Sequence, residues 1–298
     1  MAQSVAVKEA VTPDTKAYES SFMSDFYDGF WEGGKAPFDD SPVIFEAVKS
    51  AYKLRQPPPS PSDRFVVFDI GTGTGRVLRN LVRDAAKENF DMQNVELVGI
   101  DLAKPMLDRA KKLAKMDHVG KVSWVLGNGL DMQAIPEIKD LKVDFLAFAV
   151  GSIGHLLGER DPETFLHEVS KVVRPETGRA YIPLLSMQIA ERHEAGNMKP
   201  LWEGDMSMIN LPDPSISIRD VDCNHYVKDA KYVTEAKMTI YKTDEKGDEH
   251  AVDTLGYVVE LRIWKDEEYL GAAKTAGLKH LKTVSWPEIA HYFFMVEK

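Results

Sequence analysis

Two short segments of the chain carry residue types that could support chemistry. In "FDIGTGTGRV", residues 68–77, the carboxylate of Asp69 ends an apolar run, and Gly71, Gly73 and Gly75 follow at every second position. Glycine lets the backbone turn sharply and approach a ligand more closely than a residue with a Cβ allows. A helix that starts behind such a turn offers free backbone N–H groups. The segment therefore predicts a binding turn for a small ligand.

The second segment, "AVGSIGHL", residues 149–156, places Ser152 and His155 directly after an apolar run. Imidazole exchanges a proton near neutral pH, so a histidine at the end of a strand suggests an active site. We expect Gly151 and Gly154 to leave room for a ligand beside it. The alternative is a structural histidine held by hydrogen bonds at the strand end.

Both segments must be positioned by the elements around them. The pattern alternates short apolar runs with helical spacings, which predicts a parallel sheet covered by helices on both faces. Ligands in such open sheets bind beyond the carboxyl ends of the strands, where the two segments would meet. The predicted strands are 65–70, 95–101, 121–127, 143–150 and 179–185, with helices starting near Gly75, Pro105 and Asp161.

Other segments flank or interrupt this core. Residues 188–264 alternate polar and apolar side chains, which predicts an antiparallel insertion that we call the lid. A helix over 265–278 and two closing strands follow. We expect an N-terminal tail and an aromatic-rich helical segment over 1–63, called the cap, and a core of 64–187 and 265–298.

The spacing of the glycines distinguishes between cofactors. A dinucleotide turn has the pattern G-x-G-x-x-G, but Arg76 or Leu78 stands where its last glycine should be. The observed D-x-G-x-G-x-G pattern resembles motif I of the class I S-adenosylmethionine-dependent methyltransferases. The resemblance covers roughly 64–187 and 265–298. It implies a Rossmann-like, doubly wound, mostly parallel sheet whose last strand is antiparallel.

The resemblance also implies which residues hold S-adenosylmethionine. Asp69 would hold the methionyl ammonium, Asp101 at the end of the second strand would accept the ribose hydroxyls, and Asn128 would lie near the adenine, with Asp131 as the alternative. The full set of expected cofactor residues is Asp69, Gly71, Thr72, Gly73, Gly75, Asp101, Leu102, Asn128, Gly129 and Val150.

Two further segments, "SIGHL" and "FYDGFWEGGK", resemble the N,N-dimethyltransferases that act on nucleotide-linked amino sugars in antibiotic biosynthesis. In those relatives a tyrosine and a histidine flank the amine. By position the histidine is His155, whereas Trp31 replaces the tyrosine and Tyr27 is the nearest hydroxyl. The lid differs in sequence, so substrate identity does not follow. The expected catalytic residues are His155 and Tyr27, and the expected substrate contacts are Trp31, Ser152, His225 and Arg262.

Composition excludes several classes of function. The net charge of −10 over 298 residues argues against a nucleic-acid partner. Cys223 is the single cysteine, which excludes disulfides and thiolate metal sites, and the eight histidines show no H-E-x-x-H pattern. No apolar run approaches the ~20 residues of a membrane span. We therefore expect a soluble cytoplasmic protein without a metal, with a small-molecule substrate; a homodimer is compatible with the sequence.

The sequence thus predicts methyl transfer from S-adenosylmethionine, leaving S-adenosylhomocysteine, with an amine as the first-choice acceptor. One alternative is O-methylation, in which His155 would act as a general base. The other is a non-methylating protein that keeps the cofactor-binding fold.

Overall fold

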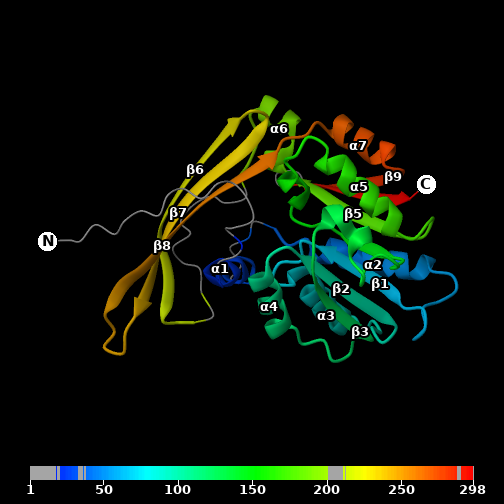
Figure 1. Ribbon diagram of the computed structural model, residues 1–298, viewed down its shortest axis with the longest axis horizontal. Coiled ribbons are helices and arrows are strands. Elements are labelled where there is room, and N and C mark those ends of the chain that lie inside the picture. Colours follow the sequence, from blue (N-terminus) through cyan, green and yellow to red (C-terminus); the bar gives the residue numbers. More distant parts are fainter. Residues whose placement is uncertain are drawn as a thin grey trace.

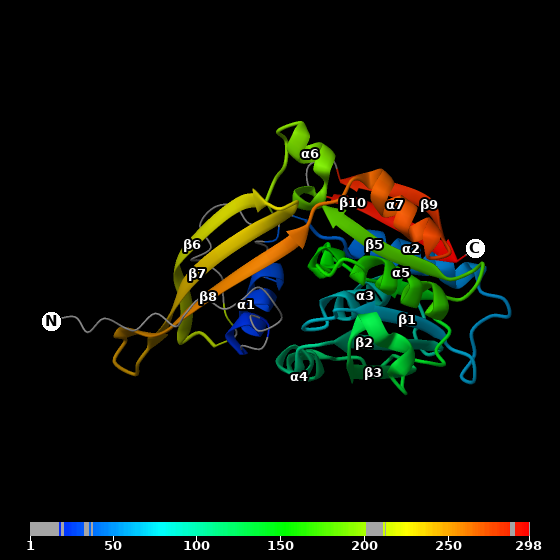
Figure 2. The same cartoon turned by 45° about the horizontal axis from the view of Figure 1, so that its top comes forward.

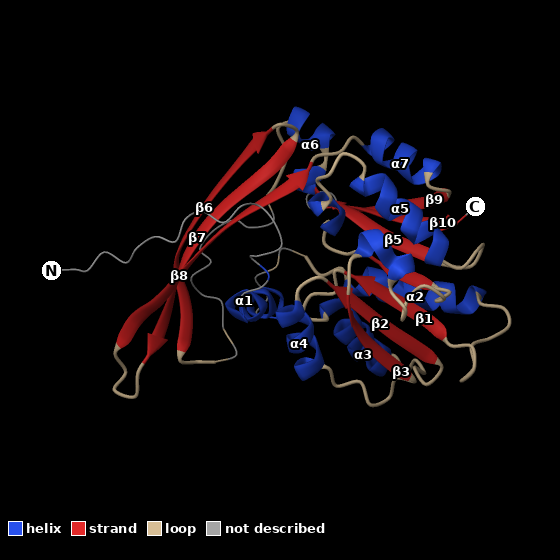
Figure 3. Ribbon diagram, in the orientation of Figure 1, coloured by secondary structure: helices blue, strands red, loops and turns tan. Residues whose placement is uncertain are grey.

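The computed structural model describes residues 18, 21–32, 36, 38–200, 211, 213–286 and 290–297. Its centre is a seven-stranded sheet in the order β3-β2-β1-β4-β5-β10-β9, with helices on both faces (Figures 1 and 3). The strands of this sheet are β1 Phe65–Ile70, β2 Val95–Asp101, β3 Lys121–Leu126, β4 Phe145–Ala147, β5 Arg179–Leu185, β9 Leu278–Trp286 and β10 Ala290–Glu297.

β1 to β5 run parallel, and β10 lies antiparallel between β5 and β9. This arrangement confirms the predicted doubly wound sheet with an antiparallel last strand. The helices are α1 Ser21–Glu32, α2 Ser41–Leu54, α3 Arg76–Lys87, α4 Lys104–Leu113, α5 Asp161–Val172, α6 Ala190–Glu194 and α7 Asp266–Thr275. Short 3-10 turns in the described residues include η2 Gly129–Ala134, η3 Ser152–His155 and η4 Ser186–Gln188.

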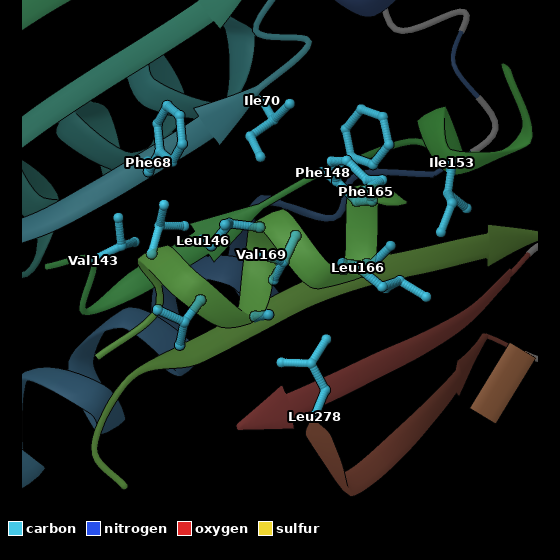
Figure 4. Packing of buried hydrophobic residues seen from close by; sticks show 14 of the residues in the cluster. Phe68, Ile70, Val143, Leu146, Phe148, Ile153, Phe165, Leu166, Val169 and Leu278 are labelled. Carbon is cyan, nitrogen blue, oxygen red and sulfur yellow. The ribbon is translucent and has the colours of Figure 1, made fainter. Parts of the chain in front are cut away.

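The surroundings of β1 explain why its sequence is a continuous apolar run. Phe65 and Val67 pack into the cluster formed with α2 and α3, whereas Phe68 and Ile70 face the cluster formed with α5 and α7. Figure 4 shows the second cluster, in which Phe165 of α5 lies beside the sheet. Because helices cover both faces, neither face of the strand needs polar side chains.

The fourth strand is shorter than the predicted 143–150. β4 ends at Ala147, and the chain then turns away through Val150 and Gly151, whose φ angles are +54° and +66°. These left-handed conformations cannot continue a strand. Residues after the strand therefore form η3, the turn that carries Ser152 and His155.

The lid forms a separate antiparallel sheet of β6 Ile216–Lys228, β7 Lys231–Thr243 and β8 Glu249–Arg262. Figure 2 shows it beside α1, and Met23, Phe26 and Phe30 of the helix pack with side chains of the sheet. An isolated bridge between Ile189 and Trp264 joins the two ends of the insertion at the core.

No helix in the described ranges has both the length and the apolar character that a membrane crossing requires.

Candidate active site

A cavity of about 510 Å³ lies at the carboxyl ends of the parallel strands. That volume is in the range of small-molecule sites. Its walls come from α1, the turn after β1, the end of β2, η3 and the lid strands β7 and β8. The predicted site residues that line it are Tyr27, Trp31, Asp69, Gly71, Thr72, Gly73, Asp101, Leu102, Asn128, Gly129, Val150, Ser152 and His155.

Three predicted site residues lie outside this lining: Gly75, His225 and Arg262. Asp131, the alternative to Asn128, is also outside it and is exposed. Gly75, His225 and Arg262 each make structural contacts, which are described below.

The glycine turn divides into two parts. Gly71 and Gly73 have φ angles of +59° and +55°, and a Cβ on Gly73 would meet no atom within 4 Å, so its surface is open to the cavity. A Cβ on Gly75 would lie 2.7 Å from the indole of Trp124. Gly75 is therefore required for packing beneath the turn, which its spacing alone does not reveal.

Two carboxylates line the cavity beside this turn. Asp101 accepts hydrogen bonds from the backbone N–H groups of Gly73 at 2.7 Å and Ala103 at 2.8 Å, which ties β2 to the glycine turn. Asp69 accepts a hydrogen bond from the hydroxyl of Thr72 at 2.6 Å. Burial raises the pKa of Asp69 to about 7 and also raises the pKa of Asp101. A cation in the cavity would stabilise both charged forms.

These groups fit S-adenosylmethionine, which carries a cationic amino acid, a ribose diol and a base. The carboxylates of Asp69 and Asp101 suit the ammonium and the diol. Leu102 lines the cavity with 53% of its surface exposed, and a planar base would cover it. Asn128, which we expected near the adenine, lines the cavity but also has a structural role. Its side-chain oxygen accepts a hydrogen bond from the N–H of Leu130 at 2.9 Å and caps η2.

The turn that carries His155 is built around a buried amide. Gln188 donates from Nε2 to the carbonyl oxygen of Gly151 at 2.7 Å, and its Oε1 accepts the N–H of Leu185 at 2.8 Å. A Cβ on Gly151 or Gly154 would lie 2.1 or 1.9 Å from this amide. The expectation that these glycines make room for a ligand was wrong, because they make room for Gln188.

Arg262 holds the segment that follows His155. Its guanidinium, at the end of β8, donates to the carbonyl oxygens of Leu156 and Leu157 at 3.3 Å and of Gly158 at 2.9 Å. The lid is thereby attached to the loop that leaves η3. The expected substrate contact is replaced by three backbone contacts.

His225 lies one layer behind the cavity wall. Its Nδ1 shares a hydrogen bond with the hydroxyl of Thr234 at 3.0 Å, and its ring stacks on Tyr232 with the centroids 5.7 Å apart. Thr234 itself lines the cavity. Ser152 also lines it, but its hydroxyl donates to the carbonyl oxygen of Ala149 at 2.7 Å.

His155 lines the cavity. His155 is an exposed residue, and the protein atoms packed around its ring lower the pKa of His155 to about 4 by partial desolvation. The imidazole is therefore neutral at physiological pH. It can accept a hydrogen bond but is a weak proton acceptor.

Tyr18 is a lining residue that the sequence analysis missed. Its ring meets His155 edge to face with centroids 6.1 Å apart, and its hydroxyl lies 3.2 Å from that of Tyr27. The local aromatic richness was the one available signal, and it did not distinguish Tyr18 from its neighbours.

The cap is fixed to the core by buried charges. Asp28 of α1 accepts hydrogen bonds from the hydroxyl of Thr74 at 2.7 Å, from Arg79 at 2.9 Å and from Arg109 at 2.8 Å. Thr74 belongs to the glycine turn, whereas the two arginines come from α3 and α4. One carboxylate thus links the helix that carries Tyr27 to the turn at the other end of the cavity.

Trp31 lies at a second charged contact. The guanidinium of Arg76 lies over its indole at 4.3 Å and donates two hydrogen bonds to Asp40, at 2.6 and 3.3 Å. Trp31 therefore both lines the cavity and packs against the start of α3.

Within the described residues, no three His, Cys, Asp or Glu side chains gather in a way that could hold a metal ion. The absence of a metal requirement stays a prediction.

Known proteins resemble this chain in sequence and fold. A methyltransferase domain family matches residues 67–176. The N-methyltransferase FrzE of Cladobotryum sp is 24% identical over 277 residues, which are 90% of this chain and 92% of that protein.

Two solved structures illustrate the likeness in fold. A S-adenosylmethionine-dependent methyltransferase from Clostridium acetobutylicum has a TM-score of 0.62 and 12% identity, covering 93% of this chain and 98% of its own. CalS10, an amino pentose methyltransferase from Micromonospora echinaspora, has a TM-score of 0.60 and 15% identity, covering 91% and 96%. The domain match and the sequence relative confirm the predicted methyltransferase enzyme with S-adenosylmethionine as its cofactor. The solved structures confirm the predicted fold.

Proposed function

We propose that this protein transfers the methyl group of S-adenosylmethionine to an amine nitrogen of a small molecule. The observation that carries the proposal is the neutral imidazole of His155 in the cavity, lowered in pKa to about 4 and next to Tyr18. The sequence relative named as an N-methyltransferase supports an amine acceptor.

The bound cofactor would supply an electrophilic methyl group on a sulfonium. The protein's residues align the acceptor with it, and such positioning can supply about 7–11 kcal/mol of the barrier in favourable cases. A neutral amine keeps its lone pair for the methyl group while its N–H donates to His155. The neighbouring hydroxyls of Tyr18 and Tyr27 offer a second polar contact at this end.

The low pKa of His155 bears on how the amine loses its charge. An imidazole with a pKa of about 4 rarely takes a proton from an ammonium ion, because the ammonium is a much weaker acid than the imidazolium that would form. We therefore assign His155 to orientation of an amine that reaches the site in its neutral form.

The same observation disfavours O-methylation of a hydroxyl. A hydroxyl must lose its proton during attack, and the most effective general base has a pKa near the operating pH. A non-methylating protein would retain the carboxylates of Asp69 and Asp101 without needing a cavity next to His155.

Labelled S-adenosylmethionine, incubated with panels of amines and phenols, tests the proposal. We expect label in amine products and none in phenol products. Transfer to phenols alone would replace the proposal with O-methylation, and cofactor binding without any transfer would favour the non-methylating alternative.

The division into cap, core and lid, a homodimer and a cytoplasmic location remain predictions. Size measurement of the purified protein tests the homodimer.

A further inference from the structure

The acceptor end of the cavity has an apolar wall. Leu156 and Leu157 follow η3, and Val259 and Leu261 come from β8. Met187 of η4 lines the same cavity and packs in one hydrophobic cluster with Leu261 and Trp31. Such a surface binds carbon skeletons, because apolar area removed from water contributes roughly 25 cal/mol per Å².

The charges that line the cavity are mostly negative. In the part of the chain that the structure describes, the charged lining residues are Asp69, Asp101, Asp161, Glu260 and Arg76. Burial is the largest cause that raises the pKa of Asp69; the Thr72 hydrogen bond and the charge of Arg76 oppose it, and the charge of Asp101 adds to it. The net raised pKa shows that this part of the cavity disfavours a negative charge. A cationic cofactor would reduce the repulsion between the carboxylates that line the cavity, whereas a phosphorylated acceptor would add negative charge to it.

The nearby cations are committed to other partners. Arg76 donates both of its hydrogen bonds to Asp40 and lies over Trp31. Lys231 pairs with Glu260 at 2.7 Å. Arg262 points its guanidinium at backbone carbonyls. Proteins bind phosphates through arginine and lysine donors, and these side chains would have to leave existing partners to do so.

We infer that the methyl acceptor is an apolar amine that carries no phosphate, and this inference rests on the proposed amine function. The amine would enter with its carbon skeleton against Leu157, Leu261 and Met187 and its nitrogen toward His155. A nucleotide-linked amine, the substrate type of the amino-sugar enzymes that the cap and η3 resemble, would place a diphosphate in an acidic cavity.

Paired probes test the inference. A set of aryl- and alkylamines is assayed with labelled cofactor, each beside its phosphorylated counterpart, such as tyramine and O-phosphotyramine, and beside a thymidine-diphosphate-linked amino sugar. We expect transfer to members of the apolar set, with kcat/KM at least about 10-fold lower for each phosphorylated partner, because like charges placed together are strongly unfavourable.

The outcomes separate the inference from the proposed function. A nucleotide-linked amino sugar that equals or exceeds the best apolar amine in kcat/KM overturns the inference and leaves amine methylation intact. Transfer to phenols, or to no amine of either set while the cofactor binds, overturns amine methylation and the inference with it.

A charge reversal in the cavity wall provides an independent test. Glu260→Lys should raise kcat/KM for the phosphorylated probes relative to the unphosphorylated ones by at least about 10-fold. Glu245→Lys is the matched control, since Glu245 lies in the exposed turn between β7 and β8. Equal shifts in the two variants would assign the preference to net charge and contradict the inference.

If thermal denaturation shows Glu260→Lys to be unfolded, Val258→Lys replaces it. Val258 also lines the cavity, and this change adds the positive charge without removing the partner of Lys231. An unchanged preference in a folded Val258→Lys protein would equally contradict the inference.

Discussion

The two ends of the cavity are built in different ways. At the cofactor end, two adjacent strands of one sheet deliver the carboxylates to the glycine turn. Asp69 accepts a hydrogen bond from Thr72 of that turn, and Asp101 accepts one from the N–H of Gly73. At the acceptor end, His155 is positioned by Gln188 and Arg262, which come from distant segments of the chain.

Because the two ends are built differently, the affinity for the cofactor and the affinity for the methyl acceptor can change separately. The cofactor end depends on the sheet, so a substitution there should alter cofactor binding and leave the acceptor contacts in place. The acceptor end depends on the cap and lid, which can vary while the sheet is preserved. The predictions below test that separation.

The largest effect is expected for His155→Ala. Loss of the imidazole should lower kcat by roughly 100-fold, the cost that misplacing the acceptor by about 1 Å can have, and leave cofactor affinity unchanged in calorimetry. His155→Asn, which keeps a hydrogen-bonding group without a basic nitrogen, should restore much of the activity if orientation is its role. No rescue would favour proton transfer, and loss of folding in His155→Ala would support the structural alternative.

The pH profile sharpens this result. Because the surrounding protein desolvates the ring and lowers the pKa of His155 to about 4, its titration should add no limb to the kcat profile between pH 5 and 9. Activity should rise with pH as the acceptor's ammonium group loses its proton, and this limb should move when an amine of different pKa is used.

Asp101→Ala should act at the other end. Removing the acceptor of two backbone hydrogen bonds should weaken cofactor binding by about 1.5–3 kcal/mol, roughly 10- to 150-fold in Kd, with kcat at saturating cofactor unchanged. Asp108→Ala is the control, since Asp108 is exposed on α4 and pairs with Lys104. A matching loss of kcat in Asp101→Ala would break the separation between the two ends.

Cofactor affinity should also depend on pH through Asp69. Its pKa is raised to about 7, so below that pH the carboxyl is protonated and cannot pair with the cofactor's ammonium. Affinity should fall about 10-fold per pH unit below 7, and binding should release a proton in calorimetry. The same raised pKa makes protonated Asp69 stabilise the free protein at low pH, a contribution that is lost as the pH rises through about 7. Asp69→Asn should remove the pH dependence of binding.

The smallest effect is expected for Arg262→Gln. Losing the contacts to the carbonyls after His155 should lower kcat about fivefold to tenfold, less than the ~100-fold that a 1 Å misplacement can cost. Arg219→Gln, on the exposed edge strand β6, should leave kcat unchanged. Equal effects of the two variants would mean that Arg262 stabilises the lid without positioning His155.

The sequence predicted the cofactor end of the site better than the acceptor end. The glycine turn and Asp101 could be identified because the sheet brings the ends of adjacent strands together. The role of Gly151 could not, because its partner Gln188 lies 37 residues away and no local pattern links them.

Other errors have the same cause. Gly75 matches the expected spacing, but whether a glycine faces a ligand or a packed ring depends on Trp124 from β3. The early end of β4 depends on the left-handed Val150, a conformation that a β-branched residue rarely takes and that tertiary contacts must impose.

The buried carboxylate of Asp28 has a consequence for the order in which ligands bind. It accepts a hydrogen bond from the hydroxyl of Thr74 in the glycine turn, and it belongs to the helix that carries Tyr27. If cofactor binding strengthens the Thr74 contact and so orders α1, acceptor affinity rises by some factor, and thermodynamic linkage requires the acceptor to raise cofactor affinity by the same factor. Titrating each ligand with and without the other measures that factor, and Asp28→Asn should bring it toward one.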